Sequence, residues 1–471
     1  MIRLVSGIAF ILFSSLAAAA AYPPRVSPIE RPYGVCAYYE GSANYCENNT
    51  APLADAGVGL IREDFPWTSV EKERGVYTVT GKDTFLDSTE RHGVWALIIF
   101  DYDNPLYPKI TDNEPAFIEG FSNYAAAVAR HLAGGGPPRG RRVIYEIWNE
   151  ENGPWRVDPV PYVHLVAATA RRVREVDPNA LICSGGVAWV DRGYLQEIAD
   201  AGIMEHVDFL GFHPYWRGLP ENDLDQDIAW MRALIAAHNR TGRKIDVLST
   251  ECGYAVNPKE PLHYKDDLGR AVSLDQPHPV VQTEAMQAAY FARMMLAHIR
   301  NRVEGIVWFK QQDWQDDGWG LLRSDGSPRP AFEALRGLSR LLARNPKELL
   351  KPPFEVKASA PNVTCDSYWL AQARAPECGA GRRMLDGDRL VIALWTPTNA
   401  YVPRARPVDL TIASDRFGMP RMYDLLDPRH VGRLLRAQRV AGRLVIPNLA
   451  VGPMPVMLEL RQNPRRSDGN G

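Results

Sequence analysis

Eight short apolar runs, separated by stretches long enough for helices, place the strongest constraint on the fold of this chain. The runs span residues 34–38, 59–63, 95–101, 143–149, 181–185, 209–213, 246–251 and 305–309. Stretches between and after them that fit helices include residues 115–132, 160–176, 225–237, 283–302 and 329–342. This alternation favours repeated βα units with a parallel sheet, and eight units are the number that closes a (β/α)8 TIM barrel. A doubly wound open sheet is the alternative, but no G-x-G-x-x-G sequence follows the first run.

The sequence changes character after residue 345, where Pro346, Pro352 and Pro353 mark a linker. Apolar segments then alternate with polar ones, and strands are expected at residues 389–395, 408–412, 444–447 and 456–460. We therefore expect a barrel at residues 22–345, a C-terminal β-sandwich at 346–462 and a disordered tail at 463–471.

Residues 1–21 have the three parts of an export signal. Positive charge at residues 1–3 precedes a mostly apolar core at 4–16 and a run of small residues at 17–21. The core is shorter than the roughly 20 apolar residues that a membrane-spanning helix needs. We expect cleavage near residues 19–21, a secreted or periplasmic protein, and no membrane association after cleavage.

The overall charge narrows the class of partner. With 54 basic and 56 acidic residues the chain is nearly neutral. This balance argues against nucleic acid and against a strongly anionic membrane as partners.

Six cysteines occur in the chain, and two pairs are close in sequence. Because exported proteins form disulfides, we expect Cys36 to pair with Cys46 and Cys365 with Cys378. The other two end strand-like runs and are expected to remain free thiols: Cys183 and Cys252. No cysteine spacing resembles a zinc site, and we expect no metal ion or organic cofactor.

Two of the apolar runs end in glutamate. Ile147-Trp148-Asn149-Glu150 closes the fourth run and Leu248-Ser249-Thr250-Glu251 closes the seventh. Barrel active sites are built from the carboxyl ends of strands, so both side chains are expected to face one site. A protonated carboxyl can protonate a leaving glycosidic oxygen while an ionised one attacks the anomeric carbon or activates water. The alternative is that each glutamate forms an ordinary surface ion pair.

The segment Trp148-Asn149-Glu150-Glu151-Asn152 is similar to the strand-four W-N-E-P-N motif of the clan A glycoside hydrolases. The resemblance implies that Glu150 is the general acid/base, that Asn149 contacts the sugar 2-hydroxyl, and that Glu251 is the nucleophile. Glu151 departs from the motif, since many members have proline there.

Three further positions carry the same resemblance. Arg62, at the end of the second run, looks like the clan arginine that keeps the nucleophile ionised, a task suited to a side chain that stays charged. His213 and Tyr215 resemble the strand-six H-x-Y element, in which the tyrosine bonds the nucleophile. Ion pairing elsewhere remains the alternative for Arg62, and a structural role the alternative for His213.

Six tryptophans fall at or just after the ends of the runs, and flat apolar faces suit sugar rings. Packing in the core is the alternative for each, and we expect it for two or three of them: Trp67, Trp155, Trp216, Trp308, Trp314 and Trp319. The resemblance implies that Trp308 is a sugar platform.

Within the clan, residues 62–83 and 320–331 most resemble glycoside hydrolase family 39, which includes β-xylosidases and bacterial endo-acting exopolysaccharide hydrolases. The resemblance implies a retaining β-glycoside hydrolase with an oligo- or polysaccharide substrate, and we expect endo action on a bacterial extracellular polysaccharide. Exo action as a β-xylosidase or β-glucosidase is one alternative. A carbohydrate-binding protein without catalysis is another, and a thiol nucleophile at Cys252 is a third.

Overall fold

The computed structural model describes residues 29–39, 42–133, 142–153, 156–215, 219–221, 223–257, 264–265, 271–272, 280–342, 345–346, 349–370, 388–397 and 405–462. The expected export signal and the expected C-terminal tail lie outside these ranges. Among the described residues, no helix has both the length and the apolar character needed to cross a membrane.

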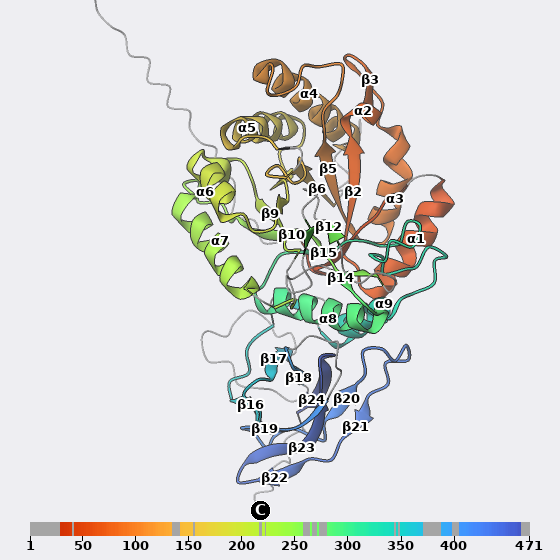
Figure 1. The fold of residues 1–471 in the computed structure, drawn as a ribbon, viewed down its shortest axis with the longest axis vertical. Coiled ribbons are helices and arrows are strands. Elements are labelled where there is room, and N and C mark those ends of the chain that lie inside the picture. Colours follow the sequence, from red (N-terminus) through yellow and green to blue (C-terminus); the bar gives the residue numbers. More distant parts are fainter. Residues whose placement is uncertain are drawn as a thin grey trace, which may run out of the picture.

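Eight parallel strands close into a barrel, which confirms the predicted fold class (Figure 1). The strands are β1 (Tyr33–Cys36), β2 (Leu60–Pro66), β5 (Trp95–Asp101), β6 (Val143–Ile147), β7 (Leu181–Ser184), β9 (Phe209–His213), β10 (Asp246–Cys252) and β15 (Ile306–Trp308). Each strand pairs with the next in this order, and β15 pairs with β1 to close the ring. Each of the eight overlaps one of the predicted runs.

A helix follows each barrel strand and covers the outside of the barrel (Figure 1). The helices are α1 (Ala43–Ala56), α3 (Asp83–Arg91), α4 (Glu114–Ala133), α5 (Pro159–Val176), α6 (Arg192–Asp200), α7 (Leu224–His238), α8 (Glu284–Arg300) and α9 (Pro330–Leu341). Capping residues determine where several of these helices begin or end. The side chains of Ser42 and Thr283 accept hydrogen bonds from backbone N–H groups in the first turns of α1 and α8, and Gly57 ends α1 at φ +102°.

The loops of the barrel contain several short helices and strands. They are α2 (Trp67–Val70), β3 (Glu71–Glu73), β4 (Val76–Tyr77), β8 (Val187–Ala188), β11 (Ala255–Val256), β12 (Tyr264–Lys265), β13 (Ala271–Val272), β14 (Val280–Val281) and the 3-10 turns Thr80–Lys82 and Ile203–Glu205. Of these, β8 pairs with β9 at the edge of the barrel sheet.

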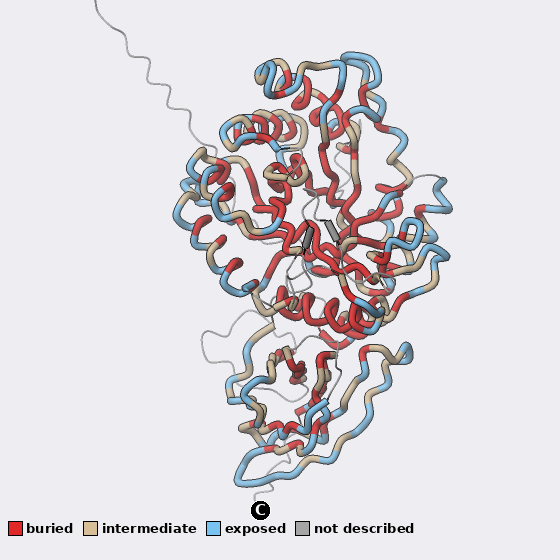
Figure 2. The backbone as a smooth tube through the Cα atoms, in the orientation of Figure 1, coloured by how far each residue is buried: buried red, intermediate tan, exposed pale blue. Residues whose placement is uncertain are grey.

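Successive side chains along each barrel strand point alternately into the barrel and outward to the helices. The strands are buried on both sides, so the barrel has an inner core and an outer core (Figure 2). The inner core is an apolar plug that includes Leu60, Leu97, Ile144, Leu181, Leu248 and Val307. The intervening residues, such as Ile61 and Ile98, pack outward against the helices. Side chains two positions beyond the plug therefore point inward again, toward the mouth of the barrel.

The C-terminal region forms two antiparallel sheets, as expected for a β-sandwich. The first contains β16 (Val356–Ala358), β19 (Arg406–Ile412), β23 (Arg443–Val451) and β22 (Gln438–Val440). The second contains β17 (Thr364–Leu370), β18 (Arg389–Trp395), β24 (Val456–Arg461), β20 (Arg421–Tyr423) and β21 (Arg433–Leu434). Apolar side chains between the sheets form a separate core.

Strand β18 explains how the sandwich attaches to the barrel. Leu390, Ile392 and Leu394 face the sandwich core, whereas Val391, Ala393 and Trp395 belong to the barrel core. Trp395 Nε1 also donates a 2.9 Å hydrogen bond to Glu221, a residue just before α7. Both faces of this sheet are therefore buried, and α8 lies between the two modules (Figure 1).

Candidate active site

A layer of charged side chains lies above the apolar plug, and Arg62 of β2 is at its centre. Its Nε donates a 2.6 Å hydrogen bond to Glu146 of β6, and its Nη2 donates 3.2 Å and 2.7 Å bonds to Glu146 and Asn149. Its Nη1 bonds Oε1 of Glu251. Because Arg62 and Glu146 are both buried, the charges must be paired, and the guanidinium binds two carboxylates at once.

Glu251 has a partner on each carboxylate oxygen. Arg62 bonds Oε1, and the hydroxyl of Tyr215 donates a 2.6 Å hydrogen bond to Oε2. Burial alone would raise the pKa of Glu251, but the charges of His213 and Arg62 and the bond from Tyr215 outweigh it. The pKa therefore lies below its ordinary value, and Glu251 is ionised at neutral pH.

Glu150 approaches Glu251 from the segment after β6. Trp148 and Glu150 have positive φ values of 73° and 51°, a backbone conformation that costs energy and is concentrated at functional sites. The backbone N–H of Glu150 bonds Gly186 O at 3.1 Å, and Asn152 makes 2.8 Å and 3.0 Å bonds with the backbone of Ala188. These contacts fix the segment that carries Glu150.

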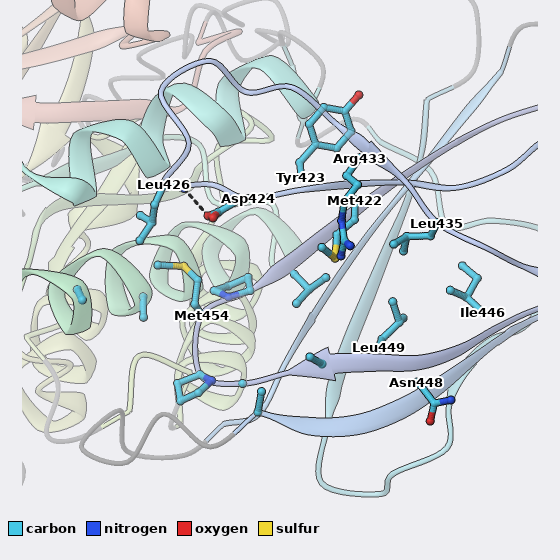
Figure 3. A pocket seen from close by; sticks show the side chains of 18 of the residues that line it. Met422, Tyr423, Asp424, Leu426, Arg433, Leu435, Ile446, Asn448, Leu449 and Met454 are labelled. Carbon is cyan, nitrogen blue, oxygen red and sulfur yellow. Dashed lines mark hydrogen bonds between the residues drawn. The ribbon is translucent and has the colours of Figure 1, made fainter.

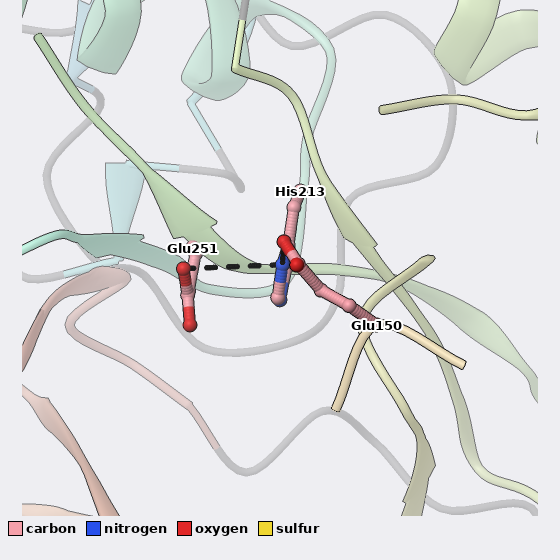
Figure 4. Close-up of side chains that lie close together, drawn as sticks. All are labelled: Glu150, His213 and Glu251. Atoms are coloured by element: carbon pink, nitrogen blue, oxygen red, sulfur yellow. Dashed lines mark hydrogen bonds and ion pairs between the residues drawn. The ribbon is translucent and has the colours of Figure 1, made fainter. Parts of the chain in front are cut away.

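His213 lies between the two glutamates, as Figure 4 shows. Its Nδ1 is 2.9 Å from Glu150 Oε1 and 3.9 Å from Glu251 Oε2, while Nε2 is 2.9 Å from the hydroxyl of Thr250. The close fit needs a glycine opposite the ring, because a Cβ at Gly186 would lie 1.9 Å from Nε2. The ring is thereby held against both carboxylates.

One oxygen of each glutamate and one ring nitrogen of His213 all lie within 4.8 Å of one another. Three such donors could hold a metal ion. However, the guanidinium of Arg62 adjoins the group and Glu251 is already bound through both oxygens, so a further cation would be repelled. The arrangement suits chemistry by two carboxyl groups better than metal binding.

Asn149 is held in place for a ligand contact. Its Oδ1 accepts from Arg62, and its Nδ2 donates a 2.8 Å hydrogen bond to the hydroxyl of Tyr102. The sequence reasoning found Arg62, Asn149, His213 and Tyr215, and the structure brings all four beside the glutamates. It missed Glu146, Tyr102 and Thr250. The signal for Glu146 was a lone charge within the apolar run of β6.

The structure corrects the prediction for Trp308. This side chain is fully buried on the outer face of β15, where it packs 5.0 Å from Phe291 of α8. It cannot serve as a sugar platform from there. Trp319 is half-buried instead and packs edge-on against Tyr215 at 5.8 Å, so it is the tryptophan beside the site.

The other described tryptophans also include both core and exposed residues. Trp67 is fully buried in the core, and Trp314 is 67% exposed. Trp155 and Trp216 lie outside the described residues. Of the four that are described, two are therefore core residues: Trp67 and Trp308.

The predicted Cys36–Cys46 disulfide is also wrong, because both residues are free thiols. Cys36 points into the barrel, where its sulfur lies 3.8 Å from Arg62 Nη1. Cys46 lies on α1 and its sulfur is 3.4 Å from the hydroxyl of Thr84. Since β1 and α1 aim the two sulfurs at different layers, proximity in sequence did not bring them together.

The remaining cysteines give a mixed outcome. Cys183 and Cys252 are free and buried, as predicted. Cys365 is also a free thiol, so the predicted Cys365–Cys378 disulfide is wrong as well; Cys378 itself lies outside the described residues.

Glu151, the departure from the clan motif, is fully buried. Within the described part of the chain neither of its carboxyl oxygens has a hydrogen-bond partner. Burial raises its pKa to about 8, so this side chain is mostly neutral at pH 7. It packs behind Glu150, next to the backbone of Gly185.

Comparisons with known proteins agree on the architecture. No family model matches the sequence, and no curated protein matches it. A solved family 39 glycoside hydrolase from the gut symbiont Bacteroides cellulosilyticus WH2 is similar, with a TM-score of 0.66 and 22% identity over 93% of this chain and 83% of that chain. A monomeric β-xylosidase from Caulobacter crescentus CB15 gives 0.59 and 16% over 94% of this chain and 98% of that chain.

A family 51 α-L-arabinofuranosidase from Bifidobacterium longum gives a TM-score of 0.58 and 14% identity, over 92% of this chain and 96% of that chain. The fold is that of the clan A glycoside hydrolases. In this chain Glu150 follows β6, the fourth barrel strand, and Glu251 lies near the end of β10, the seventh.

A cavity of about 760 Å³ lies elsewhere, between the start of α8 and the sandwich (Figure 3). Apolar side chains line much of it, among them Met286, Leu426, Leu449 and Met454. Its carboxylate, Asp424, accepts a 2.9 Å hydrogen bond from the backbone N–H of Leu426. Among its described lining residues no two carboxyl groups face each other, so the chemistry is better placed at the mouth of the barrel.

Proposed function

We propose that the protein is a retaining β-glycoside hydrolase that cleaves a bacterial extracellular polysaccharide within the chain. The proposal rests on one observation above all: oxygens of Glu150 and Glu251 lie within 4.8 Å of each other. Retaining enzymes have carboxyl groups about 5–5.5 Å apart, whereas inverting enzymes need about 6.5–9.5 Å to admit a water molecule.

The environments of the two glutamates suit different roles. Glu251, ionised and held by Arg62 and Tyr215, attacks the anomeric carbon, and Glu150 donates its proton to the departing glycosidic oxygen. Glu150 then takes a proton from water, whose oxygen attacks the same carbon and releases Glu251. Asn149, oriented by Arg62 and Tyr102, binds the hydroxyl next to the reacting carbon.

The endo assignment has separate support. An extracellular polymer as substrate agrees with the expected export signal. Trp314 and Trp319 follow β15, and their exposed or half-exposed rings suit additional sugar units. Exo action is the alternative, since a solved structure with the same fold is a β-xylosidase.

Two rival functions are less well supported. A carbohydrate-binding protein does not need two carboxyls held this close, and a thiol nucleophile at Cys252 is disfavoured because burial raises the pKa of that thiol. Sugar binding without cleavage across a broad glycan panel would favour the first rival. Full activity of Cys252→Ser would dismiss the second.

One experiment tests the proposal. The protein is incubated with bacterial polysaccharides and with aryl β-xyloside and β-glucoside, the products are sized, and the first anomer released is identified by proton NMR. Endo action gives mixed oligosaccharides, and retention gives the β anomer first. Monosaccharide as the sole early product contradicts endo action, and the α anomer first contradicts retention.

A further inference from the structure

A second pair of carboxyl groups lies beside Arg62 and takes no part in the mechanism above. Asp64 is two residues beyond Arg62 on β2, so both point into the barrel. On the neighbouring strand β5, Ile99 pairs with Asp64 and Asp101 pairs with Pro66. Asp64 and Asp101 are therefore diagonal neighbours on the inward face of adjacent strands.

Neither carboxyl group has its hydrogen-bonding capacity filled. Asp101 is only 3% exposed, and its Oδ1 has no partner within the described chain. Asp64 is half-buried and, in the same described ranges, makes no side-chain hydrogen bond or ion pair. A buried acceptor without a partner is costly, which points to a group that arrives from outside.

The positively charged side chains near this pair already bind other residues. Arg62 binds Glu146, Glu251 and Asn149, and Lys82 binds Glu63. Burial raises the pKa of both aspartates against the opposing charges of Arg62 and Lys82. The charge of Asp64 adds to the rise at Asp101, and the charges of Glu251 and Glu146 add to the rise at Asp64. The groups that act on the pair are Arg62, Lys82, Glu146 and Glu251, and Tyr38, Tyr102 and Tyr124 adjoin it.

The position of the two aspartates relative to Asn149 indicates which part of a bound sugar would lie beside them. Asn149 bonds Tyr102, the residue after Asp101, and Arg62 connects Asn149 to Glu251. On the proposed function, the sugar that becomes attached to Glu251 lies beside Asn149. Asp64 is therefore on the side of the retained sugar, and Tyr38, two residues after β1 and 43% exposed, borders it.

We propose that Asp64 binds hydroxyl groups of the retained sugar, that Asp101 positions Asp64 from behind, and that the pair selects a neutral sugar over a uronic acid. This inference rests on the proposed function. A pair that holds a proton can donate one hydrogen bond and accept others, which matches neighbouring hydroxyl groups. A uronate carboxylate would meet two carboxyls, and the described cations beside them, Arg62 and Lys82, already bind other carboxylates.

The test compares substrates that differ only at carbon 6. Initial rates are measured with 4-nitrophenyl β-glucoside and β-glucuronide, and with the corresponding galactoside and galacturonide, for the wild type, Asp64→Ala, Asp64→Asn and Asp101→Asn. Asp112→Asn, an exposed aspartate in the loop before α4, is the matched control for loss of one negative charge.

We expect the wild type to prefer the neutral sugar at least tenfold in kcat/KM. Asp64→Ala should lose at least tenfold on that sugar, mainly in KM, and Asp64→Asn should narrow the preference at least tenfold because it removes the repulsion. Raising the pH should increase KM in the wild type but not in Asp101→Asn. A wild type that hydrolyses both sugars equally, or variants that lower both rates in parallel, would overturn the proposal.

Failure of the proposed function gives a different pattern, because no glycoside is then cleaved. In that case binding of neutral and uronic oligosaccharides to the wild type and to Asp64→Asn is measured by calorimetry. Preferential binding of the neutral sugars that Asp64→Asn abolishes supports the role of the pair. Absence of binding, or preference for the uronic sugars, overturns it.

Discussion

The hydroxyl of Tyr215 lies 2.6 Å from Oε2 of Glu251, joining the segment after β9 to the end of the neighbouring strand β10. With Arg62 on the other oxygen, each carboxylate oxygen accepts one hydrogen bond and keeps a second lone pair. On the proposed function, one of these oxygens attacks the sugar through its remaining lone pair, while the hydrogen bonds from Tyr215 and Arg62 hold the carboxylate in position.

The first prediction concerns that bond. Tyr215→Phe should lower kcat/KM by roughly 10- to 100-fold, since a hydrogen bond to a charged group is worth about 1.5–3 kcal/mol. Steady-state kinetics on an aryl β-glycoside measures the loss. Tyr45→Phe, an exposed tyrosine on α1, is the control and should retain the wild-type rate. Equal rates for Tyr215→Phe and wild type would contradict the assigned role.

A second prediction follows from the charge of Arg62. Arg62→Met leaves Glu146 buried without its cation and should cost about 3–5 kcal/mol of unfolding free energy. Arg62→Lys keeps a charge but cannot bind both carboxylates in the same way, so the pKa of Glu251 should rise. Because Glu251 must be ionised to attack, the acidic limb of the pH–kcat/KM profile should move to higher pH. A profile identical to the wild type would remove Arg62 from this role.

The third prediction separates the roles of the two glutamates. Glu251→Ala should abolish turnover of every substrate, because the bond to the anomeric carbon cannot form. Glu150→Ala should retain measurable turnover of a dinitrophenyl glycoside, whose leaving group needs no protonation, while losing activity on polysaccharide. The reverse pattern would exchange the two assignments.

The sequence predicted the barrel because the period of apolar runs is a local signal that eight strands repeat. Position at strand ends then identified Glu150 and Glu251 without knowledge of their distance. The sequence did not predict whether a single side chain points into the barrel or outward. The predicted eighth run ends at Phe309, whereas β15 ends at Trp308 and turns that ring outward. A shift of one residue along a strand reverses the face that a side chain occupies.

Contacts between residues far apart in the sequence could not be predicted either. Glu146 and Arg62 are 84 positions apart, and they meet because β2 and β6 pair with opposite edges of β5 in the barrel sheet. Cys36 and Cys46 show the opposite error. Closeness in sequence favoured a disulfide, but the inward face of β1 and the contact of Cys46 with α3 keep the two sulfurs in separate layers.

The fourth prediction concerns those thiols. Mass spectrometry of denatured, unreduced protein after alkylation should show Cys36, Cys46, Cys183 and Cys252 all modified, consistent with free thiols. Cys365, which is also a free thiol, should be modified as well, and a peptide that links it to Cys378 would contradict the structure. A linked Cys36–Cys46 peptide would contradict the structure.

The last prediction concerns Glu151, a buried acid whose carboxyl oxygens have no hydrogen-bond partner among the described residues. Burial raises its pKa from 4.5 to about 8 in the folded protein. Between these two values the unfolded chain releases a proton that the folded chain retains, so stability falls as pH rises through this window. Above about pH 8 both states are ionised and this contribution stops changing.

Glu151→Gln should remove this loss while keeping a neutral side chain of the same size. We expect the variant to match the wild type near pH 4.5 and to gain stability progressively up to pH 8, on the order of 1–4 kcal/mol. Urea unfolding at pH 5 and pH 8 measures the difference. Glu119→Gln, an exposed glutamate on α4, should show no such pH-dependent gain. If Glu151→Gln instead loses stability at pH 8, its carboxylate must be charged and paired in solution, and the neutral buried state assigned to it is wrong.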